Sequence, residues 1–367
     1  MAASAPTTAV EPDGAAADAA LEAADQAGAR SFLRGFLTLF VIGVAALMAS
    51  SVLLDPAGVF DVRIVPASQQ TTRDDKARAL LGLAEKPETL VLGSSRVWSI
   101  RPARVQELTG ARAFNYGVDK GMLFDFEAIY GFARQRAGAP IKHLLIGLDV
   151  EVFDDLRDGR LEYSSMLRPY AAPGTVSSFA RMLPEYLLGS DIVDSDLRSL
   201  RNLLSGKVTV GNRTAVLPKN VFKADGSVLW PKYDEAIKSG TYDLDDQVGR
   251  GVSSWKRVYT DFNRFSPTRL AAFRSFLTRM RAEGVTVDVY IPPLHPRAMR
   301  ELPGLPERIT EGERLLAALD AEGLLHFRRA RLADFGGDPE GFYDFQHMTT
   351  ENGDRLLAKL CSPGPER

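Results

Sequence analysis

The stretch that decides the fold is TLVLGSS at residues 89–95. It is a short, largely apolar run that ends in a glycine and two serines. Such a run, bounded by a turn signal, is typical of a strand buried on both faces of a parallel sheet. Gly93 permits a tight turn at the carboxyl end of the strand, and Ser95 then projects from that turn.

Further runs of the same kind alternate with helical stretches. The predicted strands are 89–93, 113–116, 143–148, 285–291 and 324–327, and the predicted helices are 73–83, 102–108, 123–135, 267–282, 307–321 and a last one from Thr349 to 360. The clearest helix signal is Ser266 as N-cap, Pro267 in the first turn and Gly284 beyond the end. The alternation predicts an α/β fold, a parallel sheet with helices on both faces.

The alternation stops after about residue 152 and resumes near 265. The residues between, 153–260, combine turn signals with scattered aromatic residues, which are Tyr163, Tyr170, Trp230, Tyr233 and Trp255. We interpret this stretch as a mixed insertion at the edge where ligands bind in open α/β sheets. Two roles remain open: a lid or groove whose aromatic faces suit sugar rings, or aromatic residues that only pack the insertion's own core.

The N-terminal region contains an uncharged run, GFLTLFVIGVAALMASSVLL at 35–54, which predicts a transmembrane helix. Its length matches the ~30 Å of hydrocarbon that a helix must cross. Arg30 and Arg34 precede the run and Asp55 and Asp61 follow it, which favours a cytoplasmic N-terminus and a periplasmic or extracellular domain. A cleaved signal peptide with a site near residues 49–51 is the alternative, but the long polar leader favours an uncleaved anchor in the cytoplasmic membrane.

The chain of 367 residues therefore divides into four parts. We expect a disordered cytoplasmic tail at 1–34, the transmembrane helix at 35–54, a linker with a short charged helix at 55–87, and a catalytic domain at 88–362. A formal net charge of −2 gives no field that attracts nucleic acid. Cys361 is the only cysteine, so an internal disulfide is excluded, and no spacing resembles a zinc or calcium loop. We expect neither a metal nor a cofactor.

One set of residues has the composition of a nucleophilic site. A serine hydroxyl needs an adjacent base, and the base needs a third group to orient it. Ser95 ends the first strand, and far downstream YDFQH at 343–347 places Asp344 three residues before His347. That spacing lets both side chains point the same way. The sequence predicts Ser95 as nucleophile, His347 as base and Asp344 as the orienting carboxylate.

These motifs resemble the blocks of the SGNH (GDSL-like) hydrolases and acyltransferases. GSS at 93–95 is similar to the first block and D-x-x-H at 344–347 to the last, while FNYG at 114–117, with Gly121, is similar to the second. The resemblance covers about 88–151 and 265–360. It implies a three-layer, flavodoxin-like sheet and an acyl-enzyme at Ser95. It also implies an oxyanion hole to which Gly117 contributes its N–H and Asn115 is a further candidate.

The third block departs from the family, because Asp149 stands where an asparagine side chain is usual. An ionised carboxylate there would oppose an oxyanion. Asp149 either points elsewhere, is held protonated, or pairs with Arg96. His295 follows IPPL at 291–294, at the same sheet edge as Ser95, and is a candidate to line the pocket. His143 and His326 are expected to be structural or surface residues.

The resemblance implies O-acetyl chemistry on a cell-envelope polysaccharide, with a multi-spanning membrane acyltransferase as the acyl donor. In the alginate-acetylation branch of the family the Asp-His pair precedes the serine, so the likeness to that branch is architectural only. Two alternatives remain open: a carbohydrate esterase or deacetylase that uses water, and a non-catalytic glycan-binding or assembly subunit.

Overall fold

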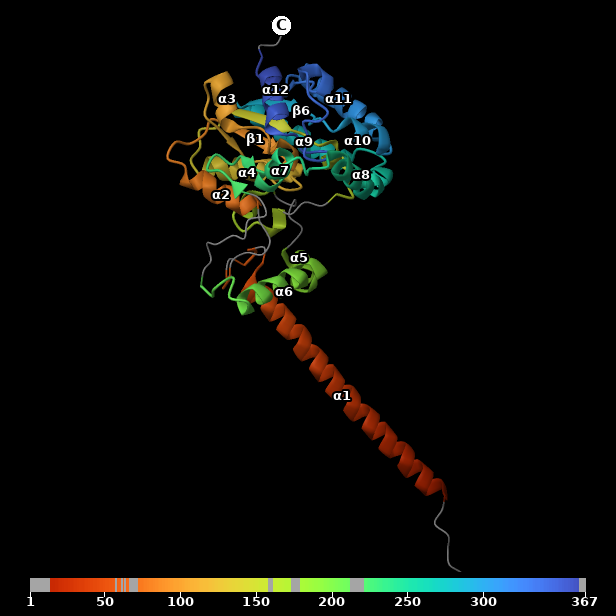
Figure 1. Cartoon of the computed structure of the whole chain (residues 1–367). Coiled ribbons are helices and arrows are strands. Elements are labelled where there is room, and N and C mark those ends of the chain that lie inside the picture. Colours follow the sequence, from red (N-terminus) through yellow and green to blue (C-terminus); the bar gives the residue numbers. More distant parts are fainter. Residues whose placement is uncertain are drawn as a thin grey trace, which may run out of the picture.

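The computed structural model describes residues 14–56, 58–60, 62, 64–65, 72–157, 161–172, 179–211 and 221–362. One long N-terminal helix, α1 (Gly14–Leu54), extends from a globular α/β body, and two short helices lie where α1 meets the rest of the chain (Figure 1). The first thirteen residues of the expected tail, and Asp61, lie outside the described residues.

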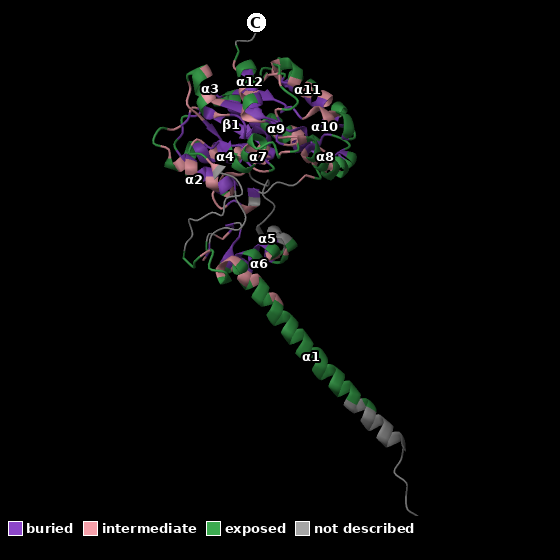
Figure 2. Ribbon diagram, viewed as in Figure 1, coloured by how far each residue is buried: buried purple, intermediate pink, exposed green. Residues whose placement is uncertain are grey.

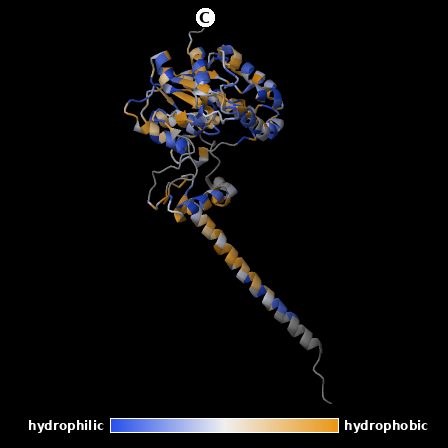
Figure 3. Cartoon of the chain, viewed as in Figure 1, coloured by the Kyte–Doolittle hydropathy of each residue, from blue (hydrophilic) through white to orange (hydrophobic). Residues whose placement is uncertain are grey.

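Helix α1 corrects the predicted boundary of the tail, because residues 14–34 are helical and continuous with the apolar run. The low hydrophobicity that suggested disorder does not prevent helix formation. This stretch is rich in alanine, the residue with the highest helix propensity, and it extends a helix that is already nucleated. Residues 25–54 are long and apolar enough to cross a membrane, and their side chains are mostly exposed in the isolated chain (Figures 2 and 3).

The body is built on five parallel strands. They are β1 (Thr89–Gly93), β2 (Ala113–Asn115), β3 (His143–Gly147), β6 (Thr286–Tyr290) and β7 (His326–Phe327). Their order across the sheet is β2-β1-β3-β6-β7. This is the order of flavodoxin-like sheets, in which the connections reverse direction between β1 and β3. The predicted α/β fold with a parallel sheet is confirmed, and every predicted strand contains the observed one.

Helices cover both faces of the sheet. The connecting and flanking helices are α2 (Thr72–Gly82), α3 (Pro102–Thr109), α4 (Leu123–Gln135), α9 (Pro267–Ala282), α10 (Pro296–Glu301), α11 (Leu305–Ala321) and α12 (Thr350–Leu360). Helices α4 and α9 have the predicted bounds. Ser266 caps α9 as predicted, since its Oγ accepts the N–H of Arg269 at 3.3 Å.

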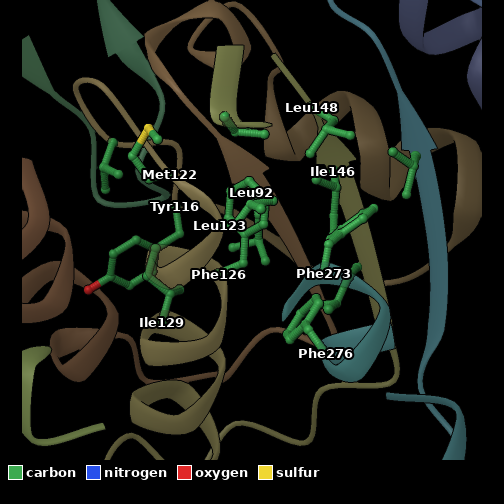
Figure 4. Packing of buried hydrophobic residues seen from close by; sticks show 14 of the residues in the cluster. Leu92, Tyr116, Met122, Leu123, Phe126, Ile129, Ile146, Leu148, Phe273 and Phe276 are labelled. Atoms are coloured by element: carbon green, nitrogen blue, oxygen red, sulfur yellow. The ribbon is translucent and has the colours of Figure 1, made fainter. Parts of the chain in front are cut away.

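Two separate apolar layers result from the alternation of side chains along each strand. Leu92 and Ile146 face the layer formed by α2, α4, α9 and α11, in which Phe126 and Phe276 pack (Figure 4). The neighbouring Val91 faces the opposite layer, which α3 and α12 close. Both faces of the sheet are therefore buried from solvent, as the near-continuous apolar runs predicted.

Helix α2 is the predicted charged helix, and several of its charged side chains are buried. Arg73 forms a two-point ion pair with Asp125 of α4, at 2.7 and 2.8 Å, and Asp74 accepts a hydrogen bond from Ser165 at 3.0 Å. Lys76 is completely buried. Partners from distant segments make this burial possible.

The insertion at 153–260 forms two groups of elements. Helices α5 (Phe179–Leu188) and α6 (Ser190–Leu204) pack against α1, outside the body. Further along, the hairpin β4 (Val221–Phe222) and β5 (Val228–Leu229) leads into α7 (Pro231–Lys238) and α8 (Leu244–Asp261), which lie on the body (Figure 1). The hairpin joins the sheet edge by a hydrogen bond from the Asn115 N–H to the Asp225 carbonyl, at 2.9 Å.

Gly93 is expected to be essential to the fold. It has φ +151°, and a Cβ at this position would lie 2.7 Å from the Gly147 carbonyl oxygen and 2.7 Å from Val97 Cγ1. We predict that Gly93→Ala lowers the free energy of unfolding by about 2–4 kcal/mol, through backbone strain and overpacking.

The measurement is denaturant unfolding of the full chain in detergent micelles. The three tryptophans, Trp98, Trp230 and Trp255, report on the body. Gly82→Ala is the matched control, because no atom lies within 4 Å of its added Cβ. It should change stability by less than about 1 kcal/mol. Equal effects of the two substitutions would contradict the assignment of strain to Gly93.

Candidate active site

Ser95 lies at the carboxyl end of β1, beside the point where the strand order reverses. The chain leaves Gly93 into a short 3₁₀ turn, Ser95–Val97, whose first N–H groups have no partner within the turn. Ser94 caps this turn, because its Oγ accepts the Arg96 N–H at 3.1 Å. The turn fixes the Ser95 side chain at the sheet edge, where it is half-buried.

Ser95, His347 and Asp344 form a continuous hydrogen-bonded chain. Ser95 Oγ lies 2.8 Å from His347 Nε2, and His347 Nδ1 lies 2.7 Å from Asp344 Oδ2. With the proton on Nδ1, the imidazole donates to Asp344 and its Nε2 accepts the Ser95 hydroxyl proton. The structure therefore brings together the three residues that the sequence singled out, in the geometry that a nucleophilic serine requires.

Asp344 is held ionised by its surroundings. Burial favours its neutral form, but the attraction and hydrogen bond of His347 outweigh burial, and the pKa of Asp344 falls below its ordinary value. The backbone N–H groups of Gln346 and His347 contribute, since both donate to Asp344 Oδ1, at 2.8 and 2.9 Å. An anionic Asp344 is what stabilises an imidazolium when His347 takes a proton.

The loop that carries Asp344 and His347 is closed on itself. Its two ends pair, with the Tyr343 N–H donating to the His347 carbonyl at 2.7 Å and the Thr349 N–H to the Gly341 carbonyl at 2.9 Å. Asn352, fully buried in α12, donates to the Gly341 carbonyl at 2.9 Å. The base is therefore positioned by a rigid loop in front of α12, not by a helical turn.

The expected oxyanion donors are placed differently from the prediction. The Asn115 amide donates to the carbonyls of Val97 and Ile100, both at 2.8 Å, and its Oδ1 accepts the Gly117 N–H at 2.9 Å. Asn115 is completely buried. Asn115 thus binds the Gly117 N–H and the backbone of the turn that carries Ser95. Because these donors are already used within the protein, neither is directed at a substrate.

Asp149 pairs with Arg96, one of the three arrangements that the sequence left open. Its Oδ1 lies 3.4 Å from Arg96 Nη1, and the carboxylate is buried. Burial raises the pKa of Asp149 above its ordinary value, with repulsion from Glu151 adding to the shift, while Arg96 and a hydrogen bond from Ser94 oppose it. Asp149 is thus a member of a buried charge cluster.

Arg96 organises this cluster. It is only 3% exposed, and its guanidinium donates to both carboxylate oxygens of Glu151, at 2.6 and 3.2 Å. Its Nε also donates to Gln346 Oε1 at 3.3 Å, inside the loop that carries the base. Tyr259 of α8 donates to Glu151 as well. Sequence reasoning missed Glu151, Gln346 and Tyr259 as members of the site.

Aromatic side chains surround the imidazole of His347. The Trp98 ring stacks on it at a centroid distance of 6.4 Å, and the Trp230 ring lies at 5.2 Å. Trp230 also stacks on Tyr343 at 5.5 Å and contacts Tyr233 of α7, also at 5.5 Å. The insertion therefore supplies part of the site through Trp230 and Tyr233, both partly exposed.

Lys76 lies beneath this aromatic wall. Its Nζ donates to the Asn115 carbonyl at 3.0 Å and lies 5.8 and 5.4 Å from the Trp98 and Phe222 ring centroids. Burial lowers the pKa of Lys76 well below its ordinary value, against the attraction of Asp225. The position of α2 ahead of the first strand gave no sign that this lysine reaches the site.

His295 supports the loop of the base from outside. Its Nδ1 accepts the Arg297 N–H at 3.2 Å at the start of α10, and its own N–H donates to the Phe345 carbonyl at 2.9 Å. Its ring packs edge-on against Phe342 at 5.6 Å. Burial lowers the pKa of His295. His295 is thus a helix cap that holds the 342–345 backbone.

Comparison of the sequence with protein-family models and with curated proteins gives no match. Within the part of the chain that the structure describes, no group of three or more His, Cys, Asp or Glu side chains is placed to hold a metal ion. The functional argument therefore depends on the geometry of the Ser95–His347–Asp344 chain and its surroundings.

Removing Glu151 should destabilise the body, because it leaves the buried Arg96 without its two-point partner. We predict that Glu151→Leu costs about 3–5 kcal/mol of unfolding free energy, measured by tryptophan fluorescence in denaturant. Glu107→Leu, which removes the partner of Arg104 in an exposed pair, should cost less than about 1 kcal/mol. Similar costs for the two variants would show that the buried pair is not a structural constraint.

The buried amine of Lys76 should make stability depend on alkaline pH. Since its folded pKa lies below the unfolded value of about 10.4, the unfolded chain binds an extra proton between the two. Stability due to this group therefore rises with pH across that window. We predict that wild type gains stability relative to Lys76→Met as the pH rises toward about 10, measured by denaturant unfolding; a constant difference would contradict the lowered pKa.

Proposed function

We propose that this chain is a membrane-anchored serine acyltransferase or esterase of the SGNH type. The observation that carries the proposal is the hydrogen-bonded chain from Ser95 through His347 to Asp344 at the carboxyl edge of the sheet. The order of the motifs along the sequence and the flavodoxin-like strand order support it. Ligands in such sheets bind at the reversal point, which lies between β1 and β3.

The chemistry follows from the roles of the three residues. Ser95 Oγ attacks an acyl carbonyl while its proton passes to His347 Nε2, and Asp344 stabilises the imidazolium. The departing alcohol takes that proton as the carbonyl re-forms, which leaves an acyl group on Ser95. A second hydroxyl then attacks the acyl carbonyl and gives its proton to His347. Ser95 leaves with that proton, and the new ester is released.

The arrangement of donors predicts slow acyl chemistry. Asn115 and Gly117 donate to other protein groups, which leaves the Ser95 N–H, at the start of its turn, as the donor available to an oxyanion. Loss of one such donor costs about 10²–10³ in rate. The few available donors therefore favour a slow reaction, whether the acceptor is water or a sugar hydroxyl.

The acceptor that we propose is a hydroxyl of a cell-envelope polysaccharide. Trp230 and Tyr233 present partly exposed aromatic faces beside His347, and the C–H face of a sugar ring packs well on such surfaces. Residues 25–54 are apolar enough to anchor the chain in a membrane. We propose that a multi-spanning membrane acyltransferase supplies the acyl group, because an anchored enzyme needs a donor at the same membrane.

The test is release of p-nitrophenol from p-nitrophenyl acetate by the full chain in detergent micelles. Ser95→Ala and His347→Ala should each lower the rate by about 10³-fold or more, because the nucleophile or its base is lost. Ser99→Ala is the matched control, since its buried hydroxyl has no partner in the structure and its removal should leave the rate unchanged. Activity that survives both triad substitutions would show that the triad is wrong.

The product distinguishes the alternatives. Transfer predicts that added oligosaccharide accelerates the reaction and becomes acetylated, whereas an esterase would release acetate at the same rate with or without it. Failure of a fluorophosphonate probe to label Ser95 in the folded protein would favour a non-catalytic glycan-binding subunit. Asp149, which stands in place of the family's asparagine, is the residue that motivates this last test.

A further inference from the structure

Helix α6 buries three of its polar residues and exposes three of its leucines. Ser195, Asp196 and Ser199 are buried, whereas Leu197, Leu200 and Leu204 are 58%, 38% and 87% exposed. A helix on the surface of a water-soluble domain shows the opposite pattern. At 100° per residue the three leucines fall within a sector of about 60°, so they form one stripe that points away from the protein.

The position of α6 explains the inversion. Ser51, three residues before the end of α1, donates a hydrogen bond to Asp196 at 2.7 Å and approaches the Leu187 carbonyl at 3.2 Å. The buried face of α6 is therefore hydrogen-bonded, through Asp196, to the end of the apolar helix. Three residues of helix rise about 4.5 Å, so α6 lies level with the end of the candidate span (Figures 1 and 3).

The joint between α1 and the two short helices is fixed. The chain turns sharply at Asp55, which accepts a hydrogen bond from the Tyr186 hydroxyl at 2.8 Å and from the N–H groups of Phe60 and Val62. Val59, Tyr186 and Ile192 form a small apolar core around it. If α1 crosses a membrane, this joint holds α6 at the surface of that membrane.

Basic residues of α6 lie beside its leucine stripe. Arg201 and Arg198 border the leucine stripe on one side, and Lys207 follows the helix; all three are exposed. Long basic side chains of this kind reach from an apolar surface to lipid phosphates. The acidic residues lie in the first half of α6, where Asp196 faces Ser51 and Asp194 is exposed.

We propose that α6 is an interfacial helix whose Leu197, Leu200 and Leu204 lie among the lipids of the membrane that α1 crosses. The inference depends on the proposed anchoring by α1. It adds that the chain meets the membrane twice, once across and once along the surface. The same insertion carries Trp230 beside His347, so one segment connects the membrane surface to the site.

The experiment places an environment-sensitive fluorophore at three positions of the full chain in liposomes of phosphatidylcholine and phosphatidylglycerol, 3:1. Cys361→Ser removes the native thiol, and single cysteines replace Leu200 on α6, Ile42 on α1 or Lys359 on α12. Lipids that carry a nitroxide quench a label only when they contact it. We expect blue-shifted, lipid-quenched emission at positions 42 and 200, and water-like emission at position 359.

The outcomes separate the two claims. Lipid contact at position 42 with water-like emission at position 200 overturns the inference and leaves the anchor intact. A shielded but unquenched label at position 200 overturns it too, because a second protein copy then covers the stripe. Water-like emission at both positions overturns the anchor itself and the inference with it.

A second variant tests the stripe directly. Leu197→Ser with Leu204→Ser should shift the label at position 200 toward water while the label at position 42 stays in lipid. Both leucines are exposed, so the fold is expected to survive the change. Emission at position 200 that does not respond would show that the leucines do not hold α6 in the membrane.

Discussion

The buried guanidinium of Arg96 joins segments that are far apart in the chain. It follows Ser95 directly, pairs with Glu151 beyond β3, and reaches Gln346 in the loop that carries His347. Two carboxylates around one buried cation hold the pKa of Arg96 well above its ordinary value, against the effect of burial. Because loss of Arg96 would leave two buried carboxylates without a partner, the ion-pair cluster favours one arrangement of the segments that carry Ser95 and His347.

A second polar network supports the serine from the other side. Lys76 donates to the Asn115 carbonyl, and the Asn115 side chain holds the carbonyls of Val97 and Ile100 and the N–H of Gly117. The turn that presents Ser95 is thus fixed by hydrogen bonds on one side and by an ion pair on the other. Buried polar networks of this kind restrict the arrangements that the Ser95 turn can adopt.

The two parts of the insertion at 153–260 contact different regions of the molecule. One part, around Trp230, completes the wall beside His347, and the other, α5 and α6, packs against α1. The exposed leucine stripe of α6 is the observation behind our proposal that its outer face contacts lipid. The insertion therefore contributes both to the site and to the contact with α1.

The sequence by itself determined the elements whose signal is local. The apolar run at 89–93 and the capped helix at 267–282 could be located because burial on both faces and an N-cap leave marks within a few residues. The triad could be proposed because Ser95, Asp344 and His347 each sit in a short motif, and their order along the chain is informative. The uncharged run at 35–54 could be identified equally well from sequence, although the helix that contains it begins at Gly14.

Only the tertiary structure decided the polar partners. Lys76 in a charged helix, Trp230 in an irregular insertion and Tyr259 near the end of α8 carry no local sign that they meet near Ser95, because each contact joins residues far apart in sequence. The pairing of Asp149 with Arg96, and of Asn115 with Gly117, also depended on where the chain placed competing donors and acceptors. The partners of charged and hydrogen-bonding groups are determined by all the residues packed around them. Strands and helices, in contrast, are determined largely by the periodicity of apolar residues along the chain.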